Sequence, residues 1–260
     1  MLTPWPCGPA RPFSKIIFSN IHEYYRTTVP TAVKTGIVGK FGLLDNEELE
    51  DDDRGIMRSL FNLTEEIPPG NREEQIHYFR GIFGNLHPLI VEIGSGNGHF
   101  LVENALQNLE CNFIGTEILG GRARKFSQKV EKRGMYNIAI FKGDARQFVW
   151  EYLYEETVSE FIIMFPDPWP KNRHHKHRLL QQKLLQMLHH RLIPGGRVSI
   201  TTDHSLYRDY IIEEFRKTEG FAKVNLGKFT EYPDHFRGSL FEVRFRRENR
   251  SLFFMQYEKM

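Results

Sequence analysis

The sequence contains few cysteines, no long apolar run and almost no excess charge of either sign. Two cysteines, Cys7 and Cys111, are too few for a disulfide framework or a zinc cluster, which favours a reducing compartment. No segment reaches the roughly 18 apolar residues of a membrane-spanning helix, and the first residues lack the apolar core of a secretion signal. With 35 basic and 33 acidic residues, the net charge of +2 excludes a chain-wide basic field. The sequence therefore predicts a soluble, cytoplasmic protein.

What the sequence does contain is enough chain for one α/β domain with an appendage. Its 260 residues are 40% hydrophobic and 26% charged, which is typical of globular proteins. Residues 1–44 show no sustained helical or strand period, and a short helical stretch is expected around Glu73–Phe83. Residues 1–86 together are expected to form an N-terminal extension. Within it, seven of the nine residues 45–53 are acidic, which predicts a solvated linker or, alternatively, an acidic tether for a basic face. We expect the folded domain at residues 87–260.

Strands and helices alternate from His87 onward, as in a doubly wound α/β domain. The end of the chain, Leu240–Tyr257, has room for two further strands joined by a turn near Asn249. We therefore expect a Rossmann-like, doubly wound, mostly parallel sheet of seven strands. The first five strands are predicted at Leu89–Ile93, Asn112–Glu117, Asn137–Phe141, Glu160–Phe165 and Arg197–Thr202, with helices at Phe100–Leu109, Arg122–Arg133, Ala145–Tyr154, Leu179–Leu192 and Tyr207–Lys217.

A glycine-rich turn follows the first predicted strand. Gly94, Gly96 and Gly98 have the spacing Gly-x-Gly-x-Gly, whereas nicotinamide and flavin sites use Gly-x-Gly-x-x-Gly. Glycines at such a turn let the backbone approach a ligand closely, although a tight strand-to-helix turn alone would also use them. The spacing disfavours a nicotinamide enzyme.

Acidic residues end three successive predicted strands. Glu92 precedes the glycine turn, Glu117 lies 23 residues after Gly94, and Asp144 follows the third strand. A carboxylate at the place of Glu117 can accept hydrogen bonds from ribose hydroxyls, and Asp144 could reach an adenine amino group or serve only as a helix N-cap. Because ligands bind at the carboxyl ends of parallel strands, the three acids together predict a nucleoside-containing cofactor.

The most informative segment follows the fourth predicted strand and runs from Phe165 to Arg178. Prolines on both sides of Asp167 stiffen the loop and hold the carboxylate at the strand end. Trp169 offers a flat face on which a base could stack. The segment also carries cations that suit phosphates, namely Lys171, Arg173, Lys176 and Arg178. This combination predicts a nucleic-acid acceptor.

Three histidines, His174, His175 and His177, invite a metal interpretation. No cysteine lies near them, and the residues between them are cationic and would repel a metal ion. We therefore expect no metal, and a hydrogen-bonding role facing the acceptor.

Phe165–Arg178 resembles the hallmark Phe-Pro-Asp-Pro-Trp-x-Lys-x-Arg-His-x-Lys-Arg of the tRNA (guanine-N7-)-methyltransferases, the TrmB-like family, with one residue added among the histidines. Glu92 with its glycine turn, Gly115–Ile118, Asp144 and Thr202-Asp203 agree with it. The resemblance covers roughly residues 87–260. It implies a class I methyltransferase fold, S-adenosylmethionine as cofactor, tRNA as partner and 7-methylguanosine as product, expected at guanine 46 of the variable loop.

The resemblance also implies roles for individual residues. Asp167 matches the catalytic position and a cofactor contact. The other implied cofactor contacts are Glu92, Gly94, Gly96, Gly98, Glu117 and Asp144. The implied substrate contacts are Trp169, Lys171, Arg173, Asp203, Ser239 and Glu242.

Two departures from the family concern substrate docking. Ser239 replaces the family's threonine but keeps its hydroxyl, and a cationic run, Arg244–Arg250, replaces an Arg-Gly and Gly-His pattern. That run fits either phosphates or a solvated strand edge. Two other functions stay open, a methyltransferase for another RNA or a protein, and a non-catalytic RNA-binding subunit. The sequence leaves open monomer or homodimer, and whether a partner subunit is required.

Overall fold

The computed structural model describes residues 71–228 and 240–260, apart from the side chains of residues 225–228 and 240–242. Within these ranges the chain forms one seven-stranded sheet in the order β3-β2-β1-β4-β5-β7-β6. The first five strands are parallel, and β7 runs antiparallel between β5 and β6, so the predicted fold class is confirmed. The strands are β1 (Leu89–Ile93), β2 (Asn112–Glu117), β3 (Ile138–Lys142), β4 (Val158–Met164), β5 (Leu192–Thr202), β6 (Phe221–Lys228) and β7 (Phe253–Lys259).

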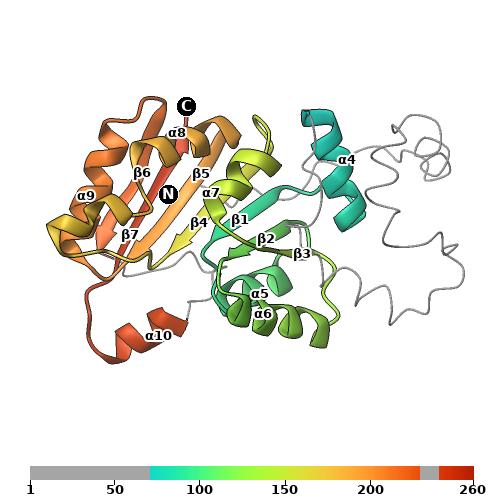
Figure 1. The fold of residues 1–260 in the computed structure, drawn as a ribbon, viewed down its shortest axis with the longest axis horizontal. Coiled ribbons are helices and arrows are strands. Elements are labelled where there is room, and N and C mark those ends of the chain that lie inside the picture. Colours follow the sequence, from blue (N-terminus) through green and yellow to red (C-terminus); the bar gives the residue numbers. More distant parts are fainter. Residues whose placement is uncertain (1–70, 229–239) are drawn as a thin grey trace, which may run out of the picture.

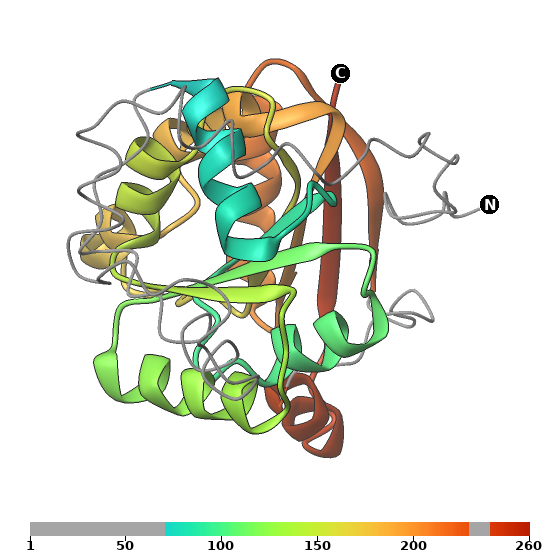
Figure 2. The same cartoon turned by 90° about the vertical axis from the view of Figure 1, so that its right-hand side faces the viewer.

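Helices cover both faces of the sheet (Figures 1 and 2). Two helices, α5 and α6, pack with the strands around a smaller core that contains Phe113 and Phe126. The remaining layer, with α4, η3, α8 and α9, packs on the opposite face around a larger core that contains Phe148 and Tyr207. The helices are α4 (Arg72–Phe83), α5 (His99–Gln107), α6 (Gly120–Lys132), α7 (Ala145–Gln147), the π-helical η3 (Phe148–Tyr152), the 3-10 helix η4 (Asn172–His177), α8 (Gln182–Arg191), α9 (Ser205–Arg216) and α10 (Leu240–Arg247).

The burial of strands β1 and β2 explains why the sequence forms a parallel sheet. Every residue of β1 and of β2 is buried, which requires a cover on each face and excludes the alternating pattern of a half-exposed strand. Their carboxyl ends consequently meet at one edge of the sheet, where the loops that follow β1, β2, β3 and β4 come together. That edge is where a ligand is expected in an open α/β sheet.

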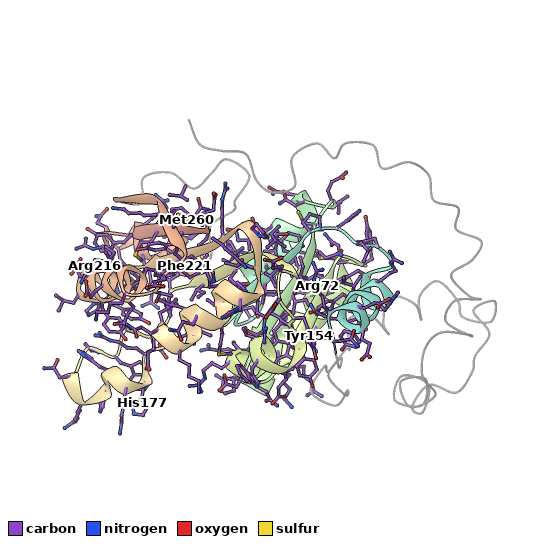
Figure 3. All side chains as sticks on the ribbon, turned by 90° about the horizontal axis from the view of Figure 1, so that it is seen from above. Arg72, Tyr154, His177, Arg216, Phe221 and Met260 are labelled. Atoms are coloured by element: carbon purple, nitrogen blue, oxygen red, sulfur yellow. The ribbon has the colours of Figure 1, made fainter. Side chains whose placement is uncertain are left out.

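Helix α4, which precedes the predicted domain start, packs against the same core. The side chain of Asn71 caps its first turn, and Phe79 and Phe83 are buried in the larger core. Arg72 donates hydrogen bonds to the carbonyl oxygens of Glu155 and Glu156 at 3.1 and 3.2 Å, close to Tyr154 (Figure 3). The predicted boundary at residue 87 stays a prediction, and the acidic linker 45–53 and Cys7 lie outside the described residues.

The prediction of two strands in Leu240–Tyr257 was wrong. Its first half is helix α10, the turn at Asn249 has a left-handed backbone with φ of 51°, and only β7 follows. The other antiparallel strand, β6, comes earlier in the chain. The apolar and basic residues of α10 alternate as in a strand, but Val243 is exposed, and Phe245 is buried against Leu252 and Phe254. Tertiary packing therefore overrides the local pattern.

Most other predicted elements are confirmed, with ends that differ by a few residues. The largest difference is in β5, which begins at Leu192 rather than Arg197, because the chain pairs with β4 as soon as α8 ends. Among the described residues, no helix is long and apolar enough to cross a membrane.

Candidate active site

A pocket of about 830 Å³ opens at the carboxyl ends of β1 to β4. It brings together residues from four loops that are far apart in the sequence. Of the predicted site residues, those that line it are Glu92, Gly94, Gly96, Glu117, Asp144, Asp167 and Trp169. The predicted contacts Gly98, Lys171, Arg173 and Asp203 do not line it. Ser239 and the side chain of Glu242 lie outside the described part of the chain.

The glycine turn forms the floor of this pocket. Gly94 and Gly96 have φ angles of 79° and 58°, which L side chains rarely adopt. The backbone N–H groups of Gly94 and Ser95 donate to the carbonyl oxygen of Thr116, at 3.1 and 2.8 Å, and so hold the turn against β2. A Cβ atom on Gly94 or Gly96 would meet no protein atom within 4 Å. The backbone there is open to a ligand.

Gly98 has a different reason to be glycine. Its φ is 72°, and a Cβ atom would lie 2.0 Å from the ring of Phe126 on α6. The residue therefore lets α6 pack closely on the turn. Its effect on a ligand would pass through the position of the helix, because it does not line the pocket.

Glu92 is the electrostatically unusual residue of the pocket. It is only 2% exposed, and within the described residues its Oε2 atom has no hydrogen-bond partner. Burial, and then the nearby charge of Glu117, raise the pKa of Glu92 to about 8. An unpartnered buried carboxylate is costly for the fold alone. A ligand that brings a hydrogen-bond donor or positive charge would remove that cost.

The other two acids of the cofactor end already have protein partners. Glu117 is buried and accepts a hydrogen bond from the backbone N–H of Leu119 at 2.7 Å. Asp144 accepts from the backbone N–H of Arg146 at 2.8 Å, as an N-cap does, and its hydrogen bonds to the Arg146 guanidinium lower its pKa. Asp144 thus lines the pocket with most of its acceptor positions occupied.

Asp167 lies in a loop with a constrained backbone. Phe165 and Trp169, two residues before and after it, are left-handed, with φ of 50° and 42°. The N–H of Phe165 donates to the carbonyl oxygen of Thr201 at 2.8 Å, which ties the loop to β5. Asp167 itself is exposed, lines the pocket and makes no hydrogen bond or ion pair with another described residue. Left-handed non-glycine residues often cluster at functional sites.

Arg178, predicted to bind phosphates, is instead a buried clamp, and that prediction was wrong. The residue is 5% exposed, and its Nε donates to the carbonyl oxygen of Pro168 at 2.9 Å. Its guanidinium lies over the rings of Tyr210 and Tyr207, 4.4 and 5.2 Å from their centroids. Cation–π contacts and a desolvated position explain why this cation turns inward. It holds the loop that carries Asp167 against α9.

Trp169 packs among histidines at the rim of the pocket. The ring centroids of His174 and His177 lie 5.7 and 5.4 Å from its own, and Figure 3 places His177 on the side of the molecule away from α4. No group of three or more potential metal ligands occurs in the described residues. Lys171 and Arg173 do not line the pocket; Lys171 is the N-cap residue of the short helix η4, and Arg173 lies within it.

Helix α10 closes one side of the site. Phe245 packs edge-on against Phe165, with centroids 5.2 Å apart, and Arg244 lines the pocket. Asp203, a predicted substrate contact, accepts a hydrogen bond from Arg250 Nη1 at 2.9 Å.

Sequence reasoning missed Arg122 and Lys125 of α6, which also line the pocket. The signal that could have found them was the dense basic composition of Gly120–Lys132.

A family model described as a putative methyltransferase matches residues 86–255 of this chain. The tRNA (guanine-N(7)-)-methyltransferase of Buchnera aphidicola is 33% identical over 167 residues, which cover 64% of this chain and 69% of that protein. That of Chlamydia abortus is 30% identical over 179 residues, 68% and 79% of the two chains. That of Chromohalobacter salexigens is 34% identical over 143 residues, which span only 55% of this chain and 58% of the relative.

Solved structures support the fold alone. A crystal structure of a 16S rRNA methyltransferase superposes with a TM-score of 0.53 at 12% identity, covering 70% of this chain and 93% of that one. The structure of an antibiotic-related methyltransferase gives 0.52 at 16% identity, with the same coverage. From the family model, these relatives, the fold and the pocket, it follows that this chain belongs to the S-adenosylmethionine-dependent tRNA (guanine-N7-)-methyltransferase family.

Proposed function

We propose that this protein transfers a methyl group from S-adenosylmethionine to N7 of a guanine in tRNA, at guanine 46 of the variable loop. One observation carries the proposal: the unpartnered carboxylate of Glu92, the glycine turn and the loop of Asp167 line a single pocket. The relatives whose names state this activity match at 30 to 34% identity. The position within the tRNA rests on the family resemblance.

The residues of the cofactor end fit S-adenosylmethionine. When bound, this molecule supplies an electrophilic methyl group on a positively charged sulfonium. The buried Oε2 of Glu92 suits a positively charged or hydrogen-bond-donating group of that molecule. The open backbone at Gly94 and Gly96 permits close approach, and Glu117, which lines the same pocket, would accept ribose hydroxyls. Asp144 would shape the pocket wall, because Arg146 occupies its oxygens.

Asp167 acts by position and charge rather than by proton transfer. Guanine N7 has an in-plane lone pair, so no proton must leave before it attacks the methyl group. What remains is to align the nitrogen, carbon and sulfur atoms, and orientation alone can contribute several kcal/mol. The purine becomes cationic as it gains the methyl group. The carboxylate of Asp167, with no protein partner in the described residues, would orient the base and stabilise that charge.

Binding of the tRNA would use the exposed cations of the catalytic loop and the face of Trp169. The base must leave its stack, at a cost of a few kcal/mol, and Trp169 offers an aromatic surface for it. Lys171, Arg173 and Lys176 are exposed beside the pocket and suit phosphates.

Recognition of the guanine edge would fall to the other end of the site. Asp203 would recognise it together with Ser239 and Glu242, and Asp203 would then exchange its Arg250 partner for the base. We propose cytoplasmic tRNA as the setting of this reaction.

The test is methyl transfer from labelled S-adenosylmethionine to unmodified tRNA transcripts, followed by chain cleavage at 7-methylguanosine. We expect label at one guanine of the variable loop and none in a transcript with adenine at that position. Label elsewhere in tRNA would refute the assigned position. Absence of label on any tRNA, with the cofactor bound, would refute the proposed acceptor. It would favour a methyltransferase for another RNA or a protein, or a non-catalytic RNA-binding subunit.

A further inference from the structure

Helix α6 carries a line of cations that starts at the rim of the pocket. Arg122 and Lys125 line the pocket, and Lys129 and Lys132 continue along the same side of the helix. With 3.6 residues per turn, residues spaced by 3, 7 and 10 share one face, and ten residues extend about 15 Å. The lone acid of the helix, Glu131, lies half a turn away from Arg122. We call Arg122, Lys125, Lys129 and Lys132 the α6 basic stripe.

The stripe is not explained by the fold. Buried Ala123, Phe126 and Val130 attach α6 to the sheet from its other side. Arg122, Lys125 and Lys132 have no ion pair or hydrogen bond with another described residue, and only Lys129 is tied, by a 2.9 Å bond to the carbonyl oxygen of Asn97.

The near end of the stripe also opposes helix stability, whereas Lys129 and Lys132, in the last turn, suit the negative end of the helix dipole. The first turn of α6 holds no acid, so Arg122 stands at the positive end of the helix dipole. Like charges three or four residues apart repel one another as well. An anionic partner would compensate both effects.

The topology places the stripe opposite the catalytic loop. Strands β2 and β4 are the two neighbours of β1, and α6 follows β2 whereas the catalytic loop follows β4. The two sets of cations therefore flank the glycine turn from opposite sides. Figure 2 shows α6 along the lower edge of the molecule.

We propose that the α6 basic stripe is a second RNA-binding surface. It binds phosphates of the RNA strand that carries the base to be methylated, at the point where this strand leaves the pocket on the side away from the catalytic loop. The inference rests on the proposed RNA acceptor. A strand that presents a base to Asp167 must pass the pocket rim on both sides. Arg122, Lys125 and Lys132 are exposed, have no partner among the described residues and extend along about 15 Å, which suits a phosphate backbone.

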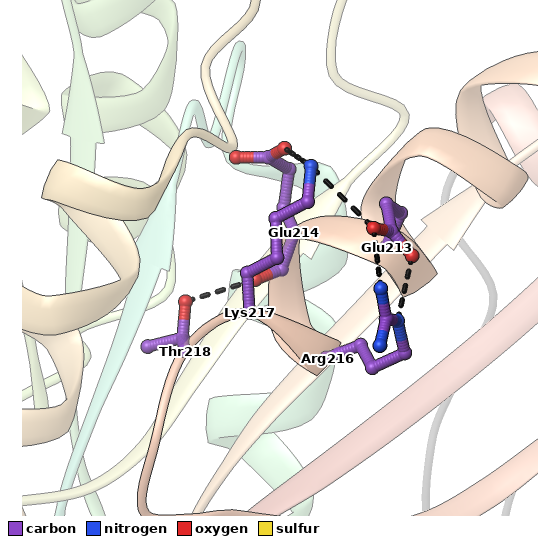
Figure 4. Close-up of polar contacts among 5 residues, drawn as sticks. All are labelled: Glu213, Glu214, Arg216, Lys217 and Thr218. Atoms are coloured by element: carbon purple, nitrogen blue, oxygen red, sulfur yellow. Dashed lines mark hydrogen bonds and ion pairs between the residues drawn. The ribbon is translucent and has the colours of Figure 1, made fainter.

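The experiment compares three variants of the full chain. Arg122→Gln/Lys125→Gln removes the near end of the stripe, and Lys132→Gln removes the far end, which does not line the pocket. Arg216→Gln/Lys217→Gln is the charge-matched control, because these α9 cations are paired with Glu213 and Glu214 (Figure 4). We measure the Kd of an unmodified tRNA transcript over a range of salt concentrations, and separately the Kd of S-adenosylmethionine.

We expect the near-end variant to weaken tRNA binding about tenfold and to lower the slope of log Kd against log salt concentration by about one to two. We expect Lys132→Gln to weaken tRNA binding about threefold. The control should match the wild type. Equal tRNA affinity in the near-end variant and the control would overturn the proposal. So would a loss confined to S-adenosylmethionine affinity, which would assign the stripe to the cofactor.

The binding readout separates this inference from the proposed function. If the wild type binds tRNA but methylates no transcript, the proposed function fails while the affinities of the variants still decide the role of the stripe. If the wild type binds no RNA, both fail.

Discussion

Two glutamates buried in neighbouring strands illustrate how differently the two ends of this sheet are built. Glu92 of β1 and Glu160 of β4 are 2% and 1% exposed, and burial raises their pKa values to about 8 and about 7. Glu160 accepts a hydrogen bond from the Ser199 hydroxyl, which in turn accepts one from Gln256 at 3.0 Å. The Oε2 of Glu92 has no such partner in the described residues. Burial alone therefore does not mark a ligand site; Glu92 combines burial, an oxygen without a partner and a position that lines the pocket.

The charged surfaces repeat this contrast. At the end of α9, Glu213 pairs with Arg216 and Lys217 at 2.8 and 3.5 Å, and Glu214 with Lys217 at 3.4 Å (Figure 4). These charges are therefore paired within α9 and at its end. The cations of α6 at the pocket have no equivalent acids. At the pocket, Glu92 Oε2, Asp167, Arg122 and Lys125 have no partner among the described residues. The following predictions test that difference, from the largest effect to the smallest.

The largest effect is expected at Asp167. Asp167→Asn keeps the shape of the side chain but removes its charge, so turnover should fall by about a hundredfold to a thousandfold, the range for losing one electrostatic contact to a transition state. Binding of tRNA should change less than threefold. Single-turnover rates at saturating tRNA measure this effect, and near-wild-type turnover would refute the proposed role.

Glu92→Gln and Glu160→Gln test the comparison of the two buried carboxylates directly. Glutamine cannot take on negative charge beside a cationic or hydrogen-bond-donating ligand, so Glu92→Gln should weaken S-adenosylmethionine binding about tenfold to a hundredfold, whereas Glu160→Gln should leave it unchanged. Isothermal titration calorimetry measures both. Equal losses in the two variants would show that the unpartnered oxygen has no special role.

Glu160 also predicts a pH dependence of stability. The pKa of Glu160 is raised in the folded state from an ordinary value of 4.5 to about 7. Between these pH values the folded protein therefore keeps a proton on Glu160 that the unfolded protein has lost. The free energy of unfolding should therefore fall as pH rises from 4.5 through 7, by on the order of 3 kcal/mol from this residue. Glu160→Gln should flatten that part of the profile in denaturant titrations, and an unchanged profile would contradict the assignment.

Arg178 should behave as a positioning residue, in contrast to the exposed cations near it. In Arg178→Lys the flexible amine cannot replace the planar guanidinium over Tyr210, so kcat should fall about tenfold while the KM for tRNA and its salt slope stay unchanged. Arg173→Gln is the matched comparison and should raise KM and reduce the salt slope. A higher KM for tRNA in Arg178→Lys would indicate that Arg178 binds tRNA phosphates.

The smallest effect is expected at the α9 pairs. Hydrogen bonds from Arg216 lower the pKa of Glu213 to about 2, but the pair lies at the surface and water screens it. Glu213→Gln should therefore shift Tm by about 2 °C or less. A larger shift in thermal unfolding would mean that paired surface charges here matter more than their exposure indicates.

Features encoded over a few residues could be predicted from the sequence. The glycine turn, with Gly94 and Gly96 at positive φ, and the acids at the ends of β1 to β3 follow from short patterns, and all of them lie where a parallel sheet must place them. The parallel direction of the first five strands follows from the same logic of buried runs and crossover helices, whereas their order became visible only in the structure.

Features that depend on distant partners could not be predicted. Arg178 looks like its neighbours in a cationic run, and only Tyr207 and Tyr210, some thirty residues later, turn it inward. Likewise, nothing local distinguishes α10 from a strand, because Phe245 finds its partner in Phe165. The use of Asp144 as an N-cap was open in the sequence and became visible only with the position of Arg146.

The position of β7 has a consequence for the order in which the chain can fold. In the described sheet β6 pairs only with β7, and β7 comes later in the chain. Phe215 stacks face to face on Tyr257 of β7, with ring centroids 3.7 Å apart. While the ribosome is still making β7, β6 has no neighbouring strand, and Phe215 contacts the ring of Phe221 but lacks that of Tyr257. Strands β1 to β5 can assemble during synthesis, whereas this edge must await the final strand and is the part most exposed to chaperones and to mispairing in a nascent chain.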